Sequence, residues 1–113
     1  MQRFKLFVLI CVVFSVVSTN EVIANEYTVL QENKKFVYRD NNIEALTIAV
    51  GDSIVFKNND SLFHNIFSLS KINKFNLGPA KSGVSKLVKF NKPGLVEIEC
   101  IFHPKMFFEL TIQ

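Results

Sequence analysis

Apolar and polar residues alternate in two stretches near the C-terminus, "GLVEIEC" (residues 94 to 100) and "MFFELTIQ" (residues 106 to 113). Successive side chains of a β-strand point to opposite faces of a sheet, so this period of two predicts strands with one buried face. In the first stretch the two glutamates share the outer face, which places Cys100 on the inner one. In the second stretch Met106 shares the inner face with Leu110 and Ile112. Both sulfur-bearing side chains are therefore expected to face the core.

Short runs rich in Val, Ile, Phe, Tyr and Thr recur along the chain and are separated by turn residues such as Gly51-Asp52 and Pro93-Gly94. Strands of this kind and spacing predict an all-β antiparallel sandwich or barrel of seven to eight strands. The predicted strands are Tyr27 to Leu30, Lys35 to Tyr38, Ile43 to Val50, Ser53 to Lys57, Phe63 to Leu69, Val84 to Phe90, Leu95 to Ile101 and Phe107 to Ile112. Residues 70 to 83 contain Gly, Pro, Lys and Asn and are predicted as a loop with room for one helical turn.

The first 24 residues are typical of a secretory signal peptide. Two basic residues precede an apolar run over residues 6 to 17, and a short polar step ends at Ala24. A membrane-spanning helix needs about 20 apolar residues, and polar residues from Ser15 onward interrupt the run too early. A lipid anchor on Cys11 is disfavoured, because Ile10 stands where a small side chain is needed. We therefore expect cleavage after Ala24, a periplasmic or otherwise exported protein, and no stable membrane insertion of the remaining chain.

Residues 25 to 113 are long enough for one compact domain and too short for two. The whole chain has 13 Lys and Arg against 10 Asp and Glu, and these charges are interspersed. This nearly even balance of positive and negative charges predicts no surface for nucleic acid or anionic lipid. Cys100 is the one cysteine after residue 24. In an oxidising compartment an unpaired cysteine implies an intermolecular disulfide, an inert buried thiol or a bond to a metal.

Residues able to bind a soft metal stand at two places in this domain. His64 lies in "NNDSLFHN", and "CIFHPKM" contains Cys100, His103 and Met106. Each is ordinary when taken alone, as a polar residue at a strand end, a buried thiol or a methionine of the core. However, these are the only histidines of the chain and its only cysteine and methionine after residue 24. Their occurrence together predicts a metal site.

The types of ligand favour copper over zinc. A structural zinc site recruits four strong ligands, and a thioether is a poor one. A thiolate, two imidazoles and a weak thioether suit both copper(I) and copper(II), and they are the ligand set of blue-copper electron-transfer sites. Pro104 restricts the loop between the sulfur ligands and favours an extended conformation of His103. We expect one type 1 copper ion.

These motifs resemble those of the cupredoxins, and most of all the branch of amicyanin and plastocyanin. The shared features are an upstream His-Asn pair, the C-terminal Cys-x-x-His-Pro-x-Met, and the stretches "VGDSIVFKNND" and "FNKPGLVEIEC" that lead to the first histidine and to the cysteine. The resemblance covers residues 43 to 113, and the short loop before Met106 is similar to that of amicyanin. It implies a Greek-key sandwich in which His64, Cys100 and His103 are equatorial copper ligands and Met106 is the axial one. Asn65 would tie the two ligand loops together.

The resemblance further implies a small carrier of single electrons between redox proteins. In such proteins the C-terminal histidine ligand reaches an apolar surface patch, so partners are expected to dock near His103 and Phe107. Further candidates for the patch and its charged rim are Phe63, Phe102, Pro104, Lys81 and Lys105. The alternative is a copper-binding module for delivery, storage or stress without electron shuttling. We expect a monomer and no enzyme, because catalytic metal sites keep a coordination position open.

Overall fold

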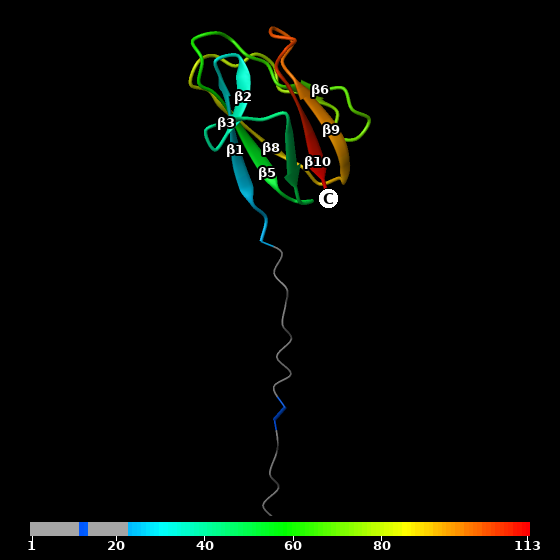
Figure 1. The fold of residues 1–113 in the computed structure, drawn as a ribbon. Helices are drawn as coiled ribbons and strands as arrows, with labels where there is room; N and C mark the ends of the chain where they lie inside the picture. The colour runs from blue at the N-terminus through cyan, green and yellow to red at the C-terminus, as the bar shows by residue number, and fades with distance from the viewer. Residues whose placement is uncertain (1–11, 14–22) are drawn as a thin grey trace, which may run out of the picture.

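The computed structural model describes residues 12–13 and 23–113, and within them the chain folds as a β-sandwich (Figure 1). The described residues form ten strands in two sheets of five strands each. The predicted all-β sandwich is confirmed, although the described residues form more strands than the seven to eight expected. The strands are β1 (Glu26–Glu32), β2 (Lys35–Tyr38), β3 (Asn41–Asn42), β4 (Ala45–Ile48), β5 (Ser53–Asn58), β6 (Phe67–Ser68), β7 (Phe75–Asn76), β8 (Ser85–Lys89), β9 (Gly94–Glu99) and β10 (Phe107–Ile112).

The predicted signal peptide, residues 1 to 24, falls almost wholly outside the described residues, so its cleavage stays a prediction. The first strand, β1, begins at Glu26, two positions after the predicted cleavage point. In the part of the chain that the structure describes, no helix is long and apolar enough to cross a membrane.

The two sheets contain both parallel and antiparallel pairs. The first sheet has the order β3-β2-β1-β5-β8, and the second has the order β4-β10-β9-β6-β7. Strand β1 runs parallel to β5, and β10 runs parallel to β4. The prediction of an antiparallel sandwich or barrel is therefore wrong at these two pairs. The alternation of apolar and polar residues along a strand indicates which face of the strand is buried. It does not indicate whether the neighbouring strand runs parallel or antiparallel.

Strands β1 and β2 form a tight hairpin whose turn residues are Asn33 and Lys34. Both have left-handed backbone conformations, with φ angles of 52° and 56°. Two successive residues of this kind are typical of a type I′ turn, whose twist matches that of the flanking strands. The turn brings Lys34 and Lys35 beside the loop that follows β9.

Two predicted elements differ from the structure. Residues 63 to 69 are predicted as one strand, yet only β6 is a strand there, and His64 forms an isolated bridge with Ala80. Residues 70 to 83 are predicted as a loop, and they contain the short strand β7 and no helical turn. The segment that carries His64 is therefore irregular, and its conformation depends on side-chain hydrogen bonds that periodicity does not reveal.

The core lies between the sheets and is rich in phenylalanine. Phe36, Phe56, Phe90 and Phe108 are all buried. The rings of Phe36 and Phe108 meet edge to face with centroids 4.9 Å apart, an arrangement that aromatic pairs prefer. The predicted inner faces of the C-terminal strands are confirmed, because both sulfur-bearing side chains, next to β9 and β10, are only 1% exposed.

A buried carboxylate joins the two sheets. Asp52 accepts hydrogen bonds from the amide of Asn25, which precedes β1, and from the amide of Ala49, which follows β4; both distances are 2.8 Å. The hydrogen bond from the amide of Asn25 has the largest effect on the pKa of Asp52, and the bond from Ala49 has the next largest. Together they hold this pKa below its usual value, although burial acts to raise it. The ionised carboxylate therefore contributes to the fold wherever it stays deprotonated.

Candidate metal centre

Three of the four predicted ligands converge at one end of the sandwich. His64 lies between β5 and β6, Cys100 directly follows β9, and His103 lies in the loop that leads to β10. The donor atoms of these three side chains all lie within 4.8 Å of one another. His64 and Cys100 are 36 positions apart in the sequence, so the fold itself builds this cluster.

The distances between donor atoms fit a small ion shared by the three side chains. The Sγ atom of Cys100 lies 3.7 Å from Nδ1 of His64 and 3.9 Å from Nδ1 of His103. Metal bonds of about 2.0 Å to nitrogen and about 2.3 Å to sulfur place these atoms about 3.7 Å apart in a trigonal plane and about 3.5 Å apart in a tetrahedron. The two observed distances are close to these values, so one small ion could be shared by all three side chains, as in a His2Cys copper site.

The backbone of His64 is held by a neighbouring segment. Its amide donates to the carbonyl oxygen of Ala80 at 3.1 Å, and its carbonyl accepts from the amide of Ala80 at 2.7 Å. The buried side chain of Asn58 donates to the carbonyls of Leu62 and Ala80 and accepts from the amide of Asp60. These bonds fix the loop after β5 and direct the His64 side chain into the interior, where it is fully buried.

Asp60 orients the imidazole ring of His64. Its Oδ2 atom lies 2.6 Å from Nε2 of His64, and the carboxylate also accepts from the amides of Asn33 at 2.6 Å and Lys34 at 3.0 Å. Burial acts to raise the pKa of Asp60, but these amides and the His64 ring together hold it below its usual value. An ionised carboxylate only accepts hydrogen bonds, so Nε2 carries the hydrogen and Nδ1 keeps its lone pair for a metal.

The sulfur of Cys100 accepts a hydrogen bond from the backbone amide of Asn65 at 3.3 Å. This bond joins the two ligand-bearing segments, as expected of Asn65, although it comes from the backbone of that residue. The Asn65 side chain instead donates to Oδ1 of Asn76. The side chain of Gln31 in β1 donates to the carbonyl oxygen of Asn65 at 3.2 Å and anchors it from the first sheet. Hydrogen bonds of this kind orient a ligand and tune its bond to a metal.

The loop from Cys100 to Met106 is closed by its own backbone. The amide of His103 donates to the carbonyl of Cys100 at 3.3 Å, and the amide of Met106 donates to the carbonyl of His103 at 2.8 Å. The amide of Cys100 donates to the carbonyl of Met106 at 3.3 Å. Met106 belongs to the same buried cluster as Cys100 and lies directly before β10. Its role as an axial ligand stays a prediction.

His103 is the member of the cluster that reaches solvent. His64 is fully buried and Cys100 is 1% exposed, whereas His103 is partly exposed. Burial lowers the pKa of His103, and the charges of His64 and Lys34 lower it further, against the opposing effect of Asp60. The neutral imidazole, which is the form that binds a metal, is therefore favoured. Within the described ranges the Cys100 thiol is in no disulfide.

The parts of this site that come from turns were not evident from the sequence. Asp60 stands four positions before His64 in "NNDSLFH", where an Asn-Asn-Asp run predicts only a turn. Lys34 and Lys35 lie beside His103, although the sequence predicted only two strands in that region. The one signal in the sequence that could have indicated the role of Asp60 is its carboxylate four positions before a histidine.

No family model matches the sequence, and no curated protein matches it. Solved structures do resemble it. A copper(I) structure of an amicyanin variant aligns with a TM-score of 0.69 and 19% identity, over 82% of this chain and 87% of that one. An oxidized amicyanin variant aligns with a TM-score of 0.68 and 18% identity, over 78% and 82% of the two chains. The chain has a cupredoxin fold.

A copper-containing nitrite reductase from Thermus scotoductus shares this cupredoxin fold over part of its length, with a TM-score of 0.67 and 21% identity. The alignment covers 78% of this chain and 22% of the reductase. The predicted fold class is thereby confirmed. The cluster of His64, Cys100 and His103, with Met106 in the adjoining core, fits a single type 1 copper ion by its donor types and spacing.

Proposed function

We propose that this cupredoxin is an exported type 1 copper protein that carries single electrons between redox partners. The observation that carries the proposal is a buried thiol and two imidazoles close enough to share one ion, with one imidazole partly exposed. Copper would supply a centre that gains or loses one electron. His64, Cys100 and His103 would be its equatorial ligands, and Met106 would be its axial ligand.

The hydrogen bonds around the ligands support fast transfer. Asp60 holds the ring of His64, the amide of Asn65 holds the sulfur, and the closed loop holds His103. Ligands that are fixed before the metal changes its charge require little rearrangement when it does. A site built in this way suits repeated transfer of one electron.

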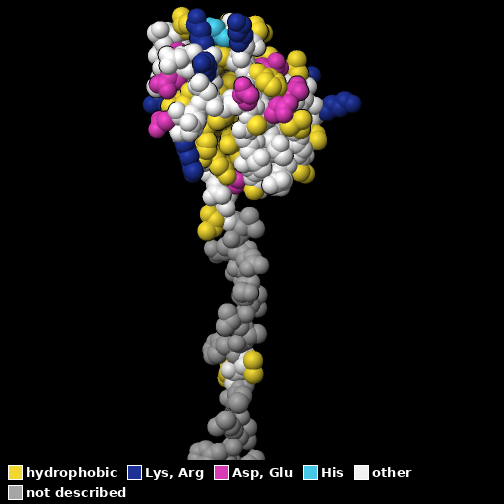
Figure 2. Space-filling model, in the orientation of Figure 1, with side chains coloured by type: hydrophobic (Ala, Val, Ile, Leu, Met, Phe, Trp, Pro, Cys, Tyr) yellow, Lys and Arg dark blue, Asp and Glu magenta, His cyan; other side chains and the backbone are white. Residues whose placement is uncertain are grey.

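Electrons would enter and leave through the exposed edge of His103, and partners would dock near His103 and Phe107. Phe102 is 52% exposed and Phe107 is 37% exposed, and apolar side chains gathered on a surface commonly mark an interaction site. Figure 2 shows a histidine at the top of the molecule with basic side chains on both sides. Of the two rim lysines expected from the sequence, Lys105 lines a hollow together with His103, and Lys81 is not part of the lining of that hollow.

The partial exposure of His103 favours a second candidate, a copper-binding module for delivery, storage or stress. Such a module must hand its ion to a recipient, and an exposed ligand is a point at which a recipient could attack. We do not propose catalysis, because four side chains would fill the coordination shell, whereas catalytic sites keep a position open. The predicted signal peptide supports export to the periplasm or an equivalent compartment.

Addition of copper(II) to the purified protein tests this proposal. We expect an intense visible absorption band from thiolate-to-copper charge transfer and the electron paramagnetic resonance spectrum of type 1 copper. Both should be absent from the Cys100→Ser variant. Repeated reduction and reoxidation without loss of copper would separate a carrier from a delivery module. A colourless protein that prefers zinc would refute both copper functions.

A further inference from the structure

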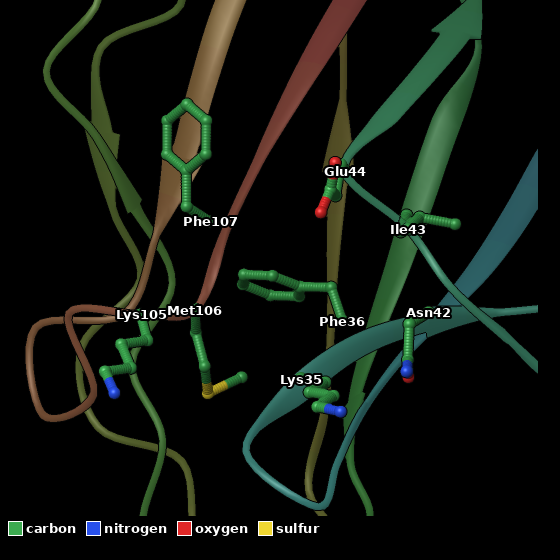
Figure 3. A pocket seen from close by; sticks show the side chains of 8 residues that line it. All are labelled: Lys35, Phe36, Asn42, Ile43, Glu44, Lys105, Met106 and Phe107. Carbon is green, nitrogen blue, oxygen red and sulfur yellow. The ribbon is translucent and has the colours of Figure 1, made fainter.

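Two hollows adjoin each other beside His103. The larger, of about 440 Å³, is lined by His103, Phe102, Pro104 and Lys34, together with Lys35 and Lys105. The smaller, of about 220 Å³, shares Lys35 and Lys105 and continues to Met106 and Phe107. Figure 3 shows Lys35 and Lys105 on either side of Met106. We call the lining of the larger hollow the lysine groove.

The lysine groove is assembled from both sheets and is held in place by the metal centre. Lys34 and Lys35 come from the β1–β2 hairpin, whereas Lys105 comes from the loop after β9. Asp60 accepts from two amides of the hairpin turn and binds the ring of His64. These bonds hold the backbone of the hairpin turn, and with it Lys34, next to the ligand-bearing loop.

The charge of this surface is positive. Among the described residues that line the lysine groove three are lysines and none is acidic. The carboxylate of Asp60 is committed to His64 and the hairpin amides, and its side chain is 13% exposed. Glu32 binds the side chain of Asn59. Glu44 lines the smaller hollow, together with Lys35 and Lys105, and does not line the lysine groove.

We propose that the lysine groove docks an electron-transfer protein whose own contact surface carries Asp and Glu side chains around an apolar centre. This inference rests on the proposed function of the copper site. Phe102 and Pro104 would supply the apolar contact next to the His103 edge, and the three lysines would pair with carboxylates of the partner. A basic partner, or a second copy of this chain approaching with the same face, would be repelled.

Charge complementarity of this kind acts mainly on the rate of association. Oppositely charged faces raise association rates by 10-fold to 1,000-fold at low salt, as an order-of-magnitude range. The screening length falls from about 30 Å at 0.01 M to about 10 Å at 0.1 M salt, so the gain should be lost over this range. Repulsion between two identical grooves has the opposite dependence on salt.

The test uses the copper-loaded protein and the soluble domain of cytochrome b5, an acidic haem protein, as the probe. The ferrous haem iron gives one electron to copper(II), so the products are ferric haem and copper(I). We expect the second-order rate constant to fall about 10-fold between 10 mM and 300 mM salt. Electron self-exchange between two copies of the protein should instead become faster with added salt.

Two triple variants with equal net charge locate the effect. One replaces Lys34, Lys35 and Lys105 by Gln, and the other replaces Lys71, Lys89 and Lys92 by Gln. The second set is exposed and lies toward the opposite end of the sandwich, where β5 and β9 begin. At 10 mM salt we expect about a 10-fold loss of rate in the first variant and less than about a twofold loss in the second. Equal losses in both variants, or no salt dependence, would overturn the proposal.

A small oxidant separates failure of this inference from failure of the proposed function. Hexacyanoferrate(III) should take one electron from the reduced wild-type protein and be reduced to hexacyanoferrate(II), while the copper colour returns. If that reaction fails, the electron-carrier function itself is refuted, and the docking proposal falls with it. If it succeeds and the cytochrome reacts equally fast with both triple variants, only the docking proposal is refuted.

Discussion

Replacement of Asp60 by Asn is the most direct probe of how the metal centre is held. The carboxylate accepts three N–H groups, from the amides of Asn33 and Lys34 and from Nε2 of His64. An asparagine side chain has one acceptor oxygen and turns an NH2 group toward the remaining donors. With its oxygen on Asn33, the variant leaves the ring of His64 without an acceptor.

The expected loss follows from the burial of that ring. His64 is fully buried, so its bond to an ionised carboxylate is of the charge-assisted kind that contributes about 1.5–3 kcal/mol. Loss of a partner behind a metal-binding histidine weakens metal affinity by about 10-fold to 100-fold. We therefore expect Asp60→Asn to bind copper about 10-fold to 100-fold more weakly, measured by competition with a chelator of known affinity.

A matched control separates the bond from the charge. Glu97→Gln removes one carboxylate charge from the exposed face of β9, and its copper affinity should stay within about twofold of the wild type. Urea unfolding of both apo-proteins reports the effect on the fold. If Asp60→Asn loses stability but keeps wild-type copper affinity, Asp60 only anchors the hairpin and the reasoning is refuted.

Three further predictions concern the fold. Because the pKa of Asp52 is lower in the folded protein, its ionised carboxylate stabilises the fold fully above the pKa of about 3.9 that an unfolded chain has. This stabilisation is lost as the pH falls through the lower pKa of the folded state. Asp52→Asn should therefore flatten the acid side of a plot of urea-unfolding free energy against pH, and an unchanged plot would contradict this. Phe108→Ala should cost about 3–5 kcal/mol in urea unfolding, against less than about 1 kcal/mol for the more exposed Phe107→Ala; similar losses would disprove the assignment of faces. At Gly94 the φ angle of 143° is one that residues with a β-carbon rarely adopt, so Gly94→Ala should lower the midpoint of urea unfolding, and an unchanged midpoint would contradict this.

The sequence pattern predicted the C-terminal half of the site well because that half is local. Alternation in the stretches around β9 and β10 determined which side chains face inward, and β10 has the predicted bounds Phe107–Ile112. Cys100 and His103 are three positions apart in one loop, so their proximity needs little from the rest of the fold. The structure places their donor atoms as close as a shared ion requires.

The other half depends on contacts between distant segments. Residues 63 to 66 have the composition of a strand, but Asn58 and the bridge to Ala80 impose an irregular conformation on them. Parallel pairing of β1 with β5 brings the hairpin turn to Asp60, and no local pattern reports that pairing. Lys34 and Lys35, which line the hollow beside His103, were missed for the same reason, whereas Lys105 was expected from the sequence.

The separation of 36 positions between His64 and Cys100 has a consequence for the unfolded chain. An ion bound to both would act as a cross-link that closes this long segment into a ring, much as a covalent sulfur bridge does. By chain-entropy estimates, a closure of this length disfavours the unfolded ensemble by about 4 kcal/mol, provided that the ion stays bound when the sandwich opens. A domain with a lone thiol would thus gain, through its metal, the kind of reinforcement that many small exported proteins obtain by pairing cysteines.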